Sequence, residues 1–236
     1  MTTGTRRPYF PIFIDVEGKK ILVVGGGEVA ARKVRTLLPY GPDLTVVAEK
    51  AVDEIIAAAG EGLLALVVRR FEESDLGGQL FVIAATNNGD TNARVAAACR
   101  DLKIPVNVVD APELCDFTVP AIVQRGSVQL AISTGGSSPA LAKAIRQRAE
   151  KTVGPEIAAA SELLGSLRQE AKRILASDGE RKRFFDAVLD SGFLDLAAAG
   201  RPAEAYAAAG LVCDEWRVPR SEVIDRFLIE DNEGDR

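Results

Sequence analysis

KILVVGGGEVAARKVRTLL, residues 20–38, predicts a buried strand, a triple-glycine turn and a helix in direct succession. Residues 21–24 are a continuous run of β-favouring apolar side chains, which is typical of a parallel strand covered on both faces. Gly25, Gly27 and Ala30 match the pattern G-x-G-x-x-G/A of dinucleotide-binding turns. In that pattern the first glycine makes the tight turn, the second lets the main chain approach a pyrophosphate, and the third small residue keeps the helix close to the strand. The stretch therefore predicts a dinucleotide site, against the alternative of a glycine-rich turn without a ligand.

A second strand follows at the spacing that a dinucleotide site requires. Gly41 is a suitable end for the first helix, and residues 44–48 predict a strand that leads into Glu49. The Glu49 carboxylate could accept both hydrogen bonds of an adenosine ribose, and it would repel the 2′-phosphate of NADP. Lys50 slightly weakens this preference for NAD, because a cation tolerates a phosphate.

Composition places the chain among ordinary globular proteins. Its 236 residues suffice for one large domain or two smaller ones, and 47% of them are hydrophobic while 27% are charged. No apolar run approaches the ~18 residues of a membrane span, and the first residues lack the core of a signal peptide. We therefore expect a cytoplasmic protein that contacts no membrane.

The net charge and the absence of histidine exclude several classes of ligand and of reaction. The net charge of −5 argues against nucleic-acid binding, so an anionic ligand must be held by local cations or helix N-termini. The chain contains no histidine, which excludes Ser-His-Asp hydrolases and leaves proton transfer to Asp, Glu, Lys, Tyr or Cys. Cys99, Cys115 and Cys213 match neither a disulfide framework nor a thiolate zinc site, and we expect no stable metal site.

The first half of the chain alternates strands and helices. Beyond the second strand, the pattern predicts helices at 52–59 and 90–101 and strands at 63–68, 79–85 and 104–109. Ahead of the first strand, the extended segment 9–14 is expected to add an edge strand or to cover the sheet. The polar residues 86–90 follow a strand at the edge where open α/β sheets bind ligands, although a plain turn is an equal alternative. The predicted cofactor contacts are Gly25, Gly27, Glu28, Val29, Glu49, Lys50, Thr86 and Asn87.

A β-hairpin interrupts this alternation. Residues 117–124 and 128–133 flank Arg125-Gly126-Ser127, which is a hairpin signal. Because a two-stranded ribbon is marginal alone, it must extend the main sheet or pair with another chain, and a homodimer formed through this region is the simpler solution. Next, Ser138 predicts the N-cap and Pro139 the first residue of a helix, whose start is a second candidate anion site.

The remainder of the chain predicts amphipathic helices at 155–176, 179–189, 201–209 and 219–229. The fold class is thus α/β, with a Rossmann-type parallel sheet, a β-hairpin and a small C-terminal helical domain. The expected domains are 1–113 for NAD binding, 114–150 for dimerisation and substrate, and 151–236 for the helices.

Six phrases spread along the chain resemble the precorrin-2 dehydrogenase family and the N-terminal module of multifunctional siroheme synthases. They are FPIF (10–13), VVGGGEVA (23–30) with Arg32-Lys33, IAAT (83–86), NVVDAP (107–112), FTVPA (117–121) and STGGSSPALA (133–142). The resemblance implies NAD⁺-dependent oxidation of precorrin-2 to sirohydrochlorin on the way to siroheme. It also implies that Asp110 is the acid–base residue, whereas an aspartate at a strand end otherwise often caps the following turn.

The chain departs from the resembled family at two points, and the residues that bind the substrate must be inferred separately. Thr134 stands where many relatives have a serine, and the chain has no room for the methyltransferase domain of the fused enzymes, so another protein would methylate uroporphyrinogen. Precorrin-2 carries eight carboxylates, so a net acidic protein needs a local positive field, which Arg125, Arg146 and the helix start after Ser138 could supply. The predicted substrate contacts are Arg125, Thr134, Gly135, Ser137, Ser138 and Arg146.

Two alternatives remain beside a dedicated dehydrogenase. Some members of the resembled family also insert ferrous iron, and Asp110 could receive the pyrrole protons as readily as it could serve the oxidation. A non-catalytic, NAD-responsive sensor ranks behind both, because the polar phrases around Asp110 and Thr134 exceed what nucleotide binding requires.

Overall fold

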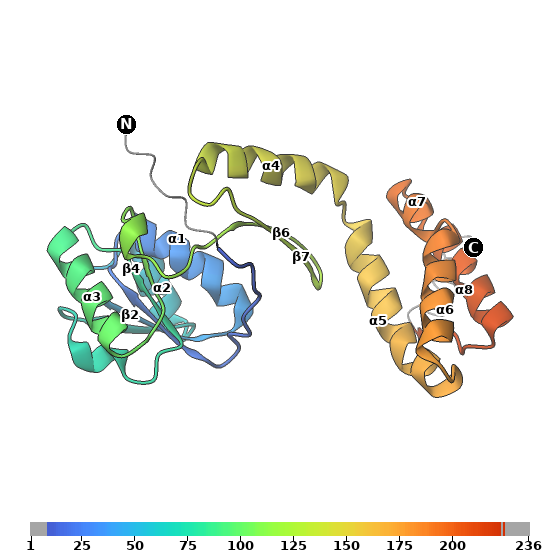
Figure 1. Ribbon diagram of the computed structural model, residues 1–236, viewed down its shortest axis with the longest axis horizontal. Helices are drawn as coiled ribbons and strands as arrows, with labels where there is room; N and C mark the ends of the chain where they lie inside the picture. Colours follow the sequence, from blue (N-terminus) through green and yellow to red (C-terminus); the bar gives the residue numbers. More distant parts are fainter. Residues whose placement is uncertain (1–8, 223, 225–236) are drawn as a thin grey trace. The chain divides into compact units, whose positions relative to one another are not determined.

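The computed structural model describes residues 9–222 and residue 224, and the chain divides into two units at Val119 and Pro120. The first unit holds a parallel β-sheet with helices on both of its faces, and the second holds a β-hairpin followed by helices (Figure 1).

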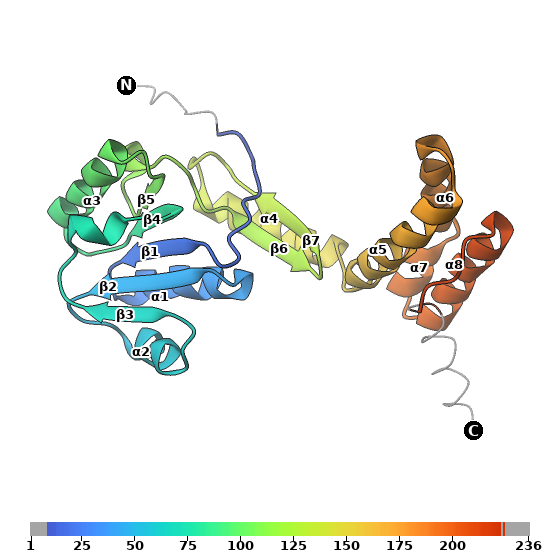
Figure 2. The same cartoon turned by 90° about the horizontal axis from the view of Figure 1, so that it is seen from below.

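Five parallel strands form the sheet of the first unit. They are β1 (Lys20–Val24), β2 (Asp43–Ala48), β3 (Ala65–Val68), β4 (Phe81–Ala84) and β5 (Val106–Val108). Figure 2 shows them side by side in the order β3-β2-β1-β4-β5. In the register, Ile21 of β1 lies opposite Leu44 of β2 and Phe81 of β4. The strand order reverses between β1 and β4, which is the switch point where such sheets bind ligands. The predicted α/β fold is therefore confirmed.

Successive side chains of β1 point to opposite faces of the sheet, which gives each face its own core. Ile21 and Val23 pack with α1 (Glu28–Leu37) and α2 (Asp53–Gly60). Leu22 and Val24 pack with α3 (Gly89–Asp101) on the other face. All four side chains are almost completely buried, so the apolar run serves both cores at once.

Several predicted boundaries shift by a few residues. A short 3-10 helix, η1 (Leu38–Tyr40), follows α1, and Gly41 then ends the helical segment in the left-handed conformation (φ 67°). Strand β5 begins only after Pro105, which has no N–H to donate; its carbonyl accepts a hydrogen bond from the Val82 N–H at 2.9 Å. Two further 3-10 turns, η2 (Glu73–Leu76) and η3 (Pro112–Leu114), complete the first unit.

The expectation for segment 9–14 was wrong. This segment forms no strand, and its apolar side chains do not cover the sheet in the described structure. Phe10, Ile12, Phe13 and Ile14 are 85%, 64%, 70% and 51% exposed.

The hairpin forms a sheet of its own and does not extend the parallel sheet. Its strands are β6 (Ala121–Arg125) and β7 (Val128–Ile132), and Arg125 pairs with Val128. The connecting loop is therefore Gly126-Ser127, one residue shorter than predicted, with Gly126 in the left-handed conformation (φ 57°). Two helices, α4 (Pro139–Thr152) and α5 (Glu156–Ile174), pack against the hairpin. A Cβ at Gly126 would lie 3.1 Å from the Cβ of Ala158 in α5.

Four helices share the core of the second unit. They are α5, α6 (Asp178–Asp190), α7 (Phe193–Ala198) and α8 (Pro202–Trp216). The sequence pattern missed α7, because six residues are too few to show a helical period, and it ended α8 seven residues early. Most of the predicted helix 219–229 lies outside the described residues. The predicted domain limits of 113 and 150 stay predictions.

Candidate functional site

A cavity of about 860 Å³ opens at the carboxyl ends of β1, β2 and β4. Its volume lies within the range of small-molecule and cofactor sites. All residues that line it belong to the first unit, between Val24 and Arg94. Six predicted cofactor contacts are among them, namely Gly25, Gly27, Glu49, Lys50, Thr86 and Asn87. Glu28 and Val29 are in the first turn of α1 beside the cavity but are not part of its lining.

The three glycines of the turn differ in how much space a side chain would have at each position. Gly25 has φ 124°, and a Cβ there would lie 2.4 Å from the Ala85 carbonyl oxygen of the neighbouring strand end. At Gly26 a Cβ would lie 2.2 Å from the Lys50 carbonyl oxygen, so this position is closed to any side chain. At Gly27, by contrast, a Cβ would meet no atom within 4 Å. The fingerprint leaves the middle residue unspecified, so it gives no reason to single out Gly26.

The start of α1 offers uncapped N–H groups beside this turn. Gly27 is the N-cap residue with extended backbone (φ −84°, ψ −176°), and no side chain caps the helix. Helix N-termini carry a partial positive charge and donate to anions. The space at Gly27 and the uncapped helix start together suit a pyrophosphate.

Glu49 follows β2, at the end of the cavity where a dinucleotide's adenosine ribose is expected. Its Oε1 accepts a hydrogen bond from Nε of Arg70 at 2.9 Å. Both side chains are largely exposed, Glu49 at 62% and Arg70 at 86%. The predicted ribose acceptor thus has a cationic neighbour that comes from the segment after β3.

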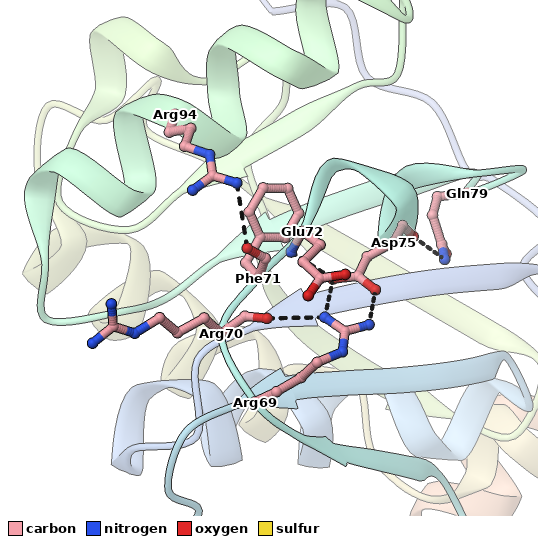
Figure 3. Close-up of polar contacts among 7 residues, drawn as sticks. All are labelled: Arg69, Arg70, Phe71, Glu72, Asp75, Gln79 and Arg94. Atoms are coloured by element: carbon pink, nitrogen blue, oxygen red, sulfur yellow. Dashed lines mark hydrogen bonds and ion pairs between the residues drawn. The ribbon is translucent and has the colours of Figure 1, made fainter.

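The main chain of Arg70 is held by the preceding arginine (Figure 3). One Nη of Arg69 donates to the Arg70 carbonyl oxygen and to the Asp75 carboxylate, both at 2.9 Å. The hydrogen bond from Arg69 lowers the pKa of Asp75. Asp75 in turn accepts from the Glu72 N–H at 2.9 Å, which closes a capping box on η2. The segment that carries Arg70 is therefore tied to η2 through Arg69 and Asp75.

Phe71 and Arg94 form the adjacent wall of the cavity. The guanidinium carbon of Arg94 lies 5.6 Å from the centre of the Phe71 ring, and Arg94 also donates to the Phe71 carbonyl oxygen at 3.4 Å. Sequence reasoning missed Arg69, Arg70, Phe71 and Arg94 as lining residues, because they belong to segments between the motifs and show no pattern of their own.

The buried side-chain amide of Asn92 holds Thr86 in place by hydrogen bonds. Oγ1 of Thr86 donates to Oδ1 of Asn92 at 2.7 Å, and the Asn92 amide nitrogen donates to the Thr86 carbonyl oxygen at 3.0 Å. Asn92 is only 7% exposed. Two residues after Thr86, Asn88 caps α3 by accepting from the Thr91 N–H at 2.9 Å. The loop is therefore both a turn and part of the cavity, so neither predicted alternative excludes the other.

Asp110 lies two residues beyond the end of β5 and does not line the cavity. Its φ of 59° is uncommon for a residue with a side chain, and the side chain is exposed. Lys33 of α1 interacts electrostatically with it: burial lowers the pKa of Lys33, as does Arg32, while Cys115 and Asp110 oppose this shift. Lys33 itself is half-buried.

The predicted substrate contacts belong to the second unit and fall into two groups. Thr134, Gly135, Ser137 and Ser138 share one loop, in which the Thr134 carbonyl oxygen accepts from the Ser137 hydroxyl at 2.6 Å. Ser138 is the N-cap of α4, as predicted, and accepts from the Leu141 N–H at 3.2 Å. Arg125 ends β6 and contacts the C-terminal end of α4, and Arg146 is in the middle of α4.

Each of these two arginines has partners within the protein. Arg125 donates to the carbonyl oxygens of Val153 (3.0 Å) and Glu150 (3.2 Å), where α4 ends. Arg146 forms an ion pair with the Glu150 carboxylate. A substrate role for either arginine stays a prediction.

Within 9–222 and 224, no helix is long and apolar enough to cross a bilayer. The same residues contain no group of three or more His, Cys, Asp or Glu side chains that could hold a metal ion.

Three family models match consecutive parts of the chain. Residues 12–121 match an NAD(P)-binding family, residues 125–151 the central region of sirohaem biosynthesis proteins, and residues 160–209 the sirohaem synthase dimerisation region. The last match falls on the C-terminal helices, whereas the sequence placed dimerisation at the hairpin.

Curated relatives and a solved structure agree with these matches. The siroheme synthase of Methylococcus capsulatus is 41% identical over 197 residues, which are 84% of this chain and 42% of that protein. The siroheme synthase of Nitrosospira multiformis is 38% identical over 203 residues, 84% of this chain and 43% of the relative. The chain thus spans less than half the length of these relatives. The solved structure titled SirC, precorrin-2 dehydrogenase, superposes with a TM-score of 0.68 at 27% identity and covers 79% of this chain and 92% of its own.

Proposed function

Because the chain belongs to the family of siroheme synthase N-terminal modules, in which an NAD(P)-binding domain is followed by a dimerisation region, we propose that it is a precorrin-2 dehydrogenase. The reaction is the oxidation of precorrin-2 to sirohydrochlorin with NAD⁺ as the acceptor. The observation that carries the proposal is the cavity at the switch point of the sheet, with its glycine turn and uncapped helix start. The similarity to a structure titled precorrin-2 dehydrogenase supports the choice of reaction.

The residues around the cavity fit a dinucleotide. Gly27 and the first turn of α1, with Glu28 and Val29, bind the pyrophosphate through main-chain N–H groups. Glu49 accepts hydrogen bonds from the adenosine ribose hydroxyls, with Lys50 beside it. Thr86 and Asn87 contact the cofactor at the end of β4, where Asn92 keeps Thr86 in place.

In the reaction, NAD⁺ supplies the acceptor for a hydride from a saturated ring carbon of the substrate. Asp110 removes the accompanying proton, since the chain has no histidine for this task. Lys33 of α1 is half-buried and lies close enough to Asp110 to interact with it electrostatically. The loop of Thr134, Gly135, Ser137 and Ser138 and the cations Arg125 and Arg146 bind the substrate carboxylates.

A direct assay tests this proposal. Purified protein supplied with NAD⁺ and enzymatically made precorrin-2 should produce NADH together with the absorbance of sirohydrochlorin. We expect Asp110→Asn to lower the rate by at least 100-fold while NADH affinity stays within about 2-fold, because Asp110 does not line the cavity. Asp101→Asn, at the exposed end of α3, is the matched control and should retain full activity. Wild-type protein that makes no NADH from verified substrate would refute the dehydrogenase, and tight NADH binding without turnover would favour the sensor.

Iron insertion is a second candidate, favoured by the exposure of Asp110 outside the cofactor cavity. A carboxylate in that place can accept pyrrole protons without any cofactor bound. Sirohydrochlorin and Fe²⁺ or Co²⁺ should be given to wild type and to Asp110→Asn in the absence of NAD⁺. Metallation that is lost in the variant would support one site for both reactions, and a rate equal to the uncatalysed background would leave a dedicated dehydrogenase.

A homodimer is the proposed assembly, supported by the match of residues 160–209 to a dimerisation region. Sedimentation equilibrium of the full chain should give twice the mass of 25.1 kDa at micromolar concentration. A monomer up to 100 µM would contradict the dimer.

A further inference from the structure

The charge around the ribose end of the cavity does not fit a site for NAD alone. Four cationic side chains line the cavity, namely Lys50, Arg69, Arg70 and Arg94. Two of them pair with carboxylates outside the lining, Arg69 with Asp75 and Arg94 with Glu73 at 3.8 Å. Glu49 is the one carboxylate among the described lining residues. Lys50 and Arg70 remain beside Glu49, so two cations face one carboxylate. A 2′-phosphate carries nearly two negative charges at neutral pH and would compensate this excess of positive charge.

The ion pair between Arg70 and Glu49 can be broken at little cost in free energy. A single hydrogen bond joins them, Arg70 Nε to Glu49 Oε1, and both side chains are mostly in water. Exposed ion pairs contribute little, because solvent screens them and two long side chains must be ordered. A phosphate offers the guanidinium stronger, bidentate hydrogen bonds, so it would compete successfully with the carboxylate.

The backbone at Arg70 is nevertheless well fixed, as Figure 3 shows. Arg69 binds the Arg70 carbonyl oxygen and the Asp75 carboxylate, which is only 10% exposed. On the other side, Arg94 lies over the Phe71 ring and binds its carbonyl oxygen. An exposed guanidinium on an anchored main chain can turn between two partners without moving the segment that carries it.

We propose that the cavity contains a subsite for the 2′-phosphate of NADP(H), in which Arg70 leaves Glu49 to bind the phosphate and Lys50 adds to the positive charge. Arg69 is a positioning residue that holds the main chain of Arg70. With NAD(H), Arg70 stays on Glu49 while the carboxylate accepts the ribose hydroxyls, so the protein uses both cofactors. This inference rests on the cofactor site of the proposed function and is independent of the oxidation of precorrin-2.

Binding measurements on the full chain test the subsite without any substrate. Dissociation constants for NADH and NADPH are measured by calorimetry at low and high salt, with the unfolding temperature of each variant as a check on folding. For wild type we expect the NADPH constant to lie within tenfold of the NADH constant and to rise more steeply with salt. Arg70→Ala should weaken NADPH at least tenfold and NADH less than threefold, and Arg70→Lys should restore part of the NADPH affinity.

The matched control is Arg35→Ala. Arg35 forms an exposed ion pair with Glu54 outside the cavity, and its loss should change neither constant. A wild-type preference for NADH above tenfold, equal effects of Arg70→Ala on both cofactors, or the absence of binding by either would overturn the inference. Binding of both cofactors as expected, with no oxidation of precorrin-2, would leave the subsite standing and refute only the proposed reaction.

Discussion

Among single residues, we expect Gly26 to be required for the fold of the glycine turn and Gly27 to be required for cofactor binding. A Cβ at Gly26 would overlap the Lys50 carbonyl oxygen at 2.2 Å, whereas a Cβ at Gly27 would meet open space. We expect Gly26→Ala to lower the free energy of unfolding by about 2 kcal/mol or more, as overpacking does. Gly27→Ala should leave the unfolding temperature within about 2 °C but weaken NADH at least tenfold, because its methyl group would stand where the pyrophosphate approaches. Chemical denaturation and NADH titration measure the two effects, and equal behaviour of the two variants would contradict this division of roles.

The buried thiol of Cys99 makes the stability of the protein depend on alkaline pH. Burial raises the pKa of the Cys99 thiol from 9.0 to about 11. The native state therefore keeps this proton longer than the unfolded chain, so its stabilising effect is complete below pH 9 and is lost as the pH rises toward 11. We expect the stability difference between wild type and Cys99→Ala to shrink by roughly 1–2 kcal/mol between pH 8 and pH 10.5. Urea unfolding at several pH values measures this, and a difference that does not change with pH would show that the thiol titrates normally.

At the scale of elements, the connection from β4 to α3 depends on one buried side chain. Asn92 accepts from the N–H and the hydroxyl of Thr86 and donates to its carbonyl oxygen. Asn92→Ala leaves these groups without their partner, and we expect a loss of about 2–3 kcal/mol in unfolding free energy together with weaker NADH binding. Asn88→Ala removes only the cap of α3 and should cost about 1 kcal/mol. If Asn92→Ala were the milder of the two, the loop would not depend on the amide.

The end of α4 offers a prediction that also tests the expected substrate role of Arg125. Its guanidinium binds the carbonyl oxygens of Val153 and Glu150 and so links β6 to the helix end. We expect Arg125→Ala to destabilise the protein by roughly 1–3 kcal/mol, whereas Arg146→Ala, which loses one helix ion pair, should change stability by less than 0.5 kcal/mol. An unchanged unfolding temperature with a raised Michaelis constant would show that Arg125 serves the substrate instead.

The elements that the sequence predicted well are those with a long or redundant signal. Strand β1 was clear because its apolar run is bounded by the glycine turn, and α4 because Ser138 and Pro139 mark its start. Helix α7 could not be found, since its six residues complete fewer than two turns. Among the residues that line the cavity, the sequence predicted Gly25, Gly27, Glu49, Lys50, Thr86 and Asn87 but not Arg70 or Arg94. Their place in the cavity follows from strand order and crossing connections, which no local pattern encodes.

At the scale of the whole molecule, the cores of the two units are separate. The two clusters around the sheet draw on residues up to Phe117, and the helical cluster begins at Ala160. We therefore expect a fragment of residues 1–119 to fold alone and to bind NADH within about threefold of the full chain, because every cavity-lining residue lies between Val24 and Arg94. Circular dichroism and calorimetry would measure this. An unfolded fragment would show that the sheet needs the second unit.

The confinement of the cavity to residues 24–94 also has a consequence during translation. Domains generally fold as units in the order in which they leave the ribosome, and the second half of this chain takes on the order of 10 s to synthesise. While the second half is being synthesised, all five strands of the parallel sheet have already been made. Nicotinamide dinucleotide in the cell can therefore bind the nascent chain before the C-terminal helices exist. The cofactor would thus stabilise the first unit before synthesis of the chain is complete. In cells depleted of the cofactor, a larger fraction of the chains should be degraded while still attached to the ribosome.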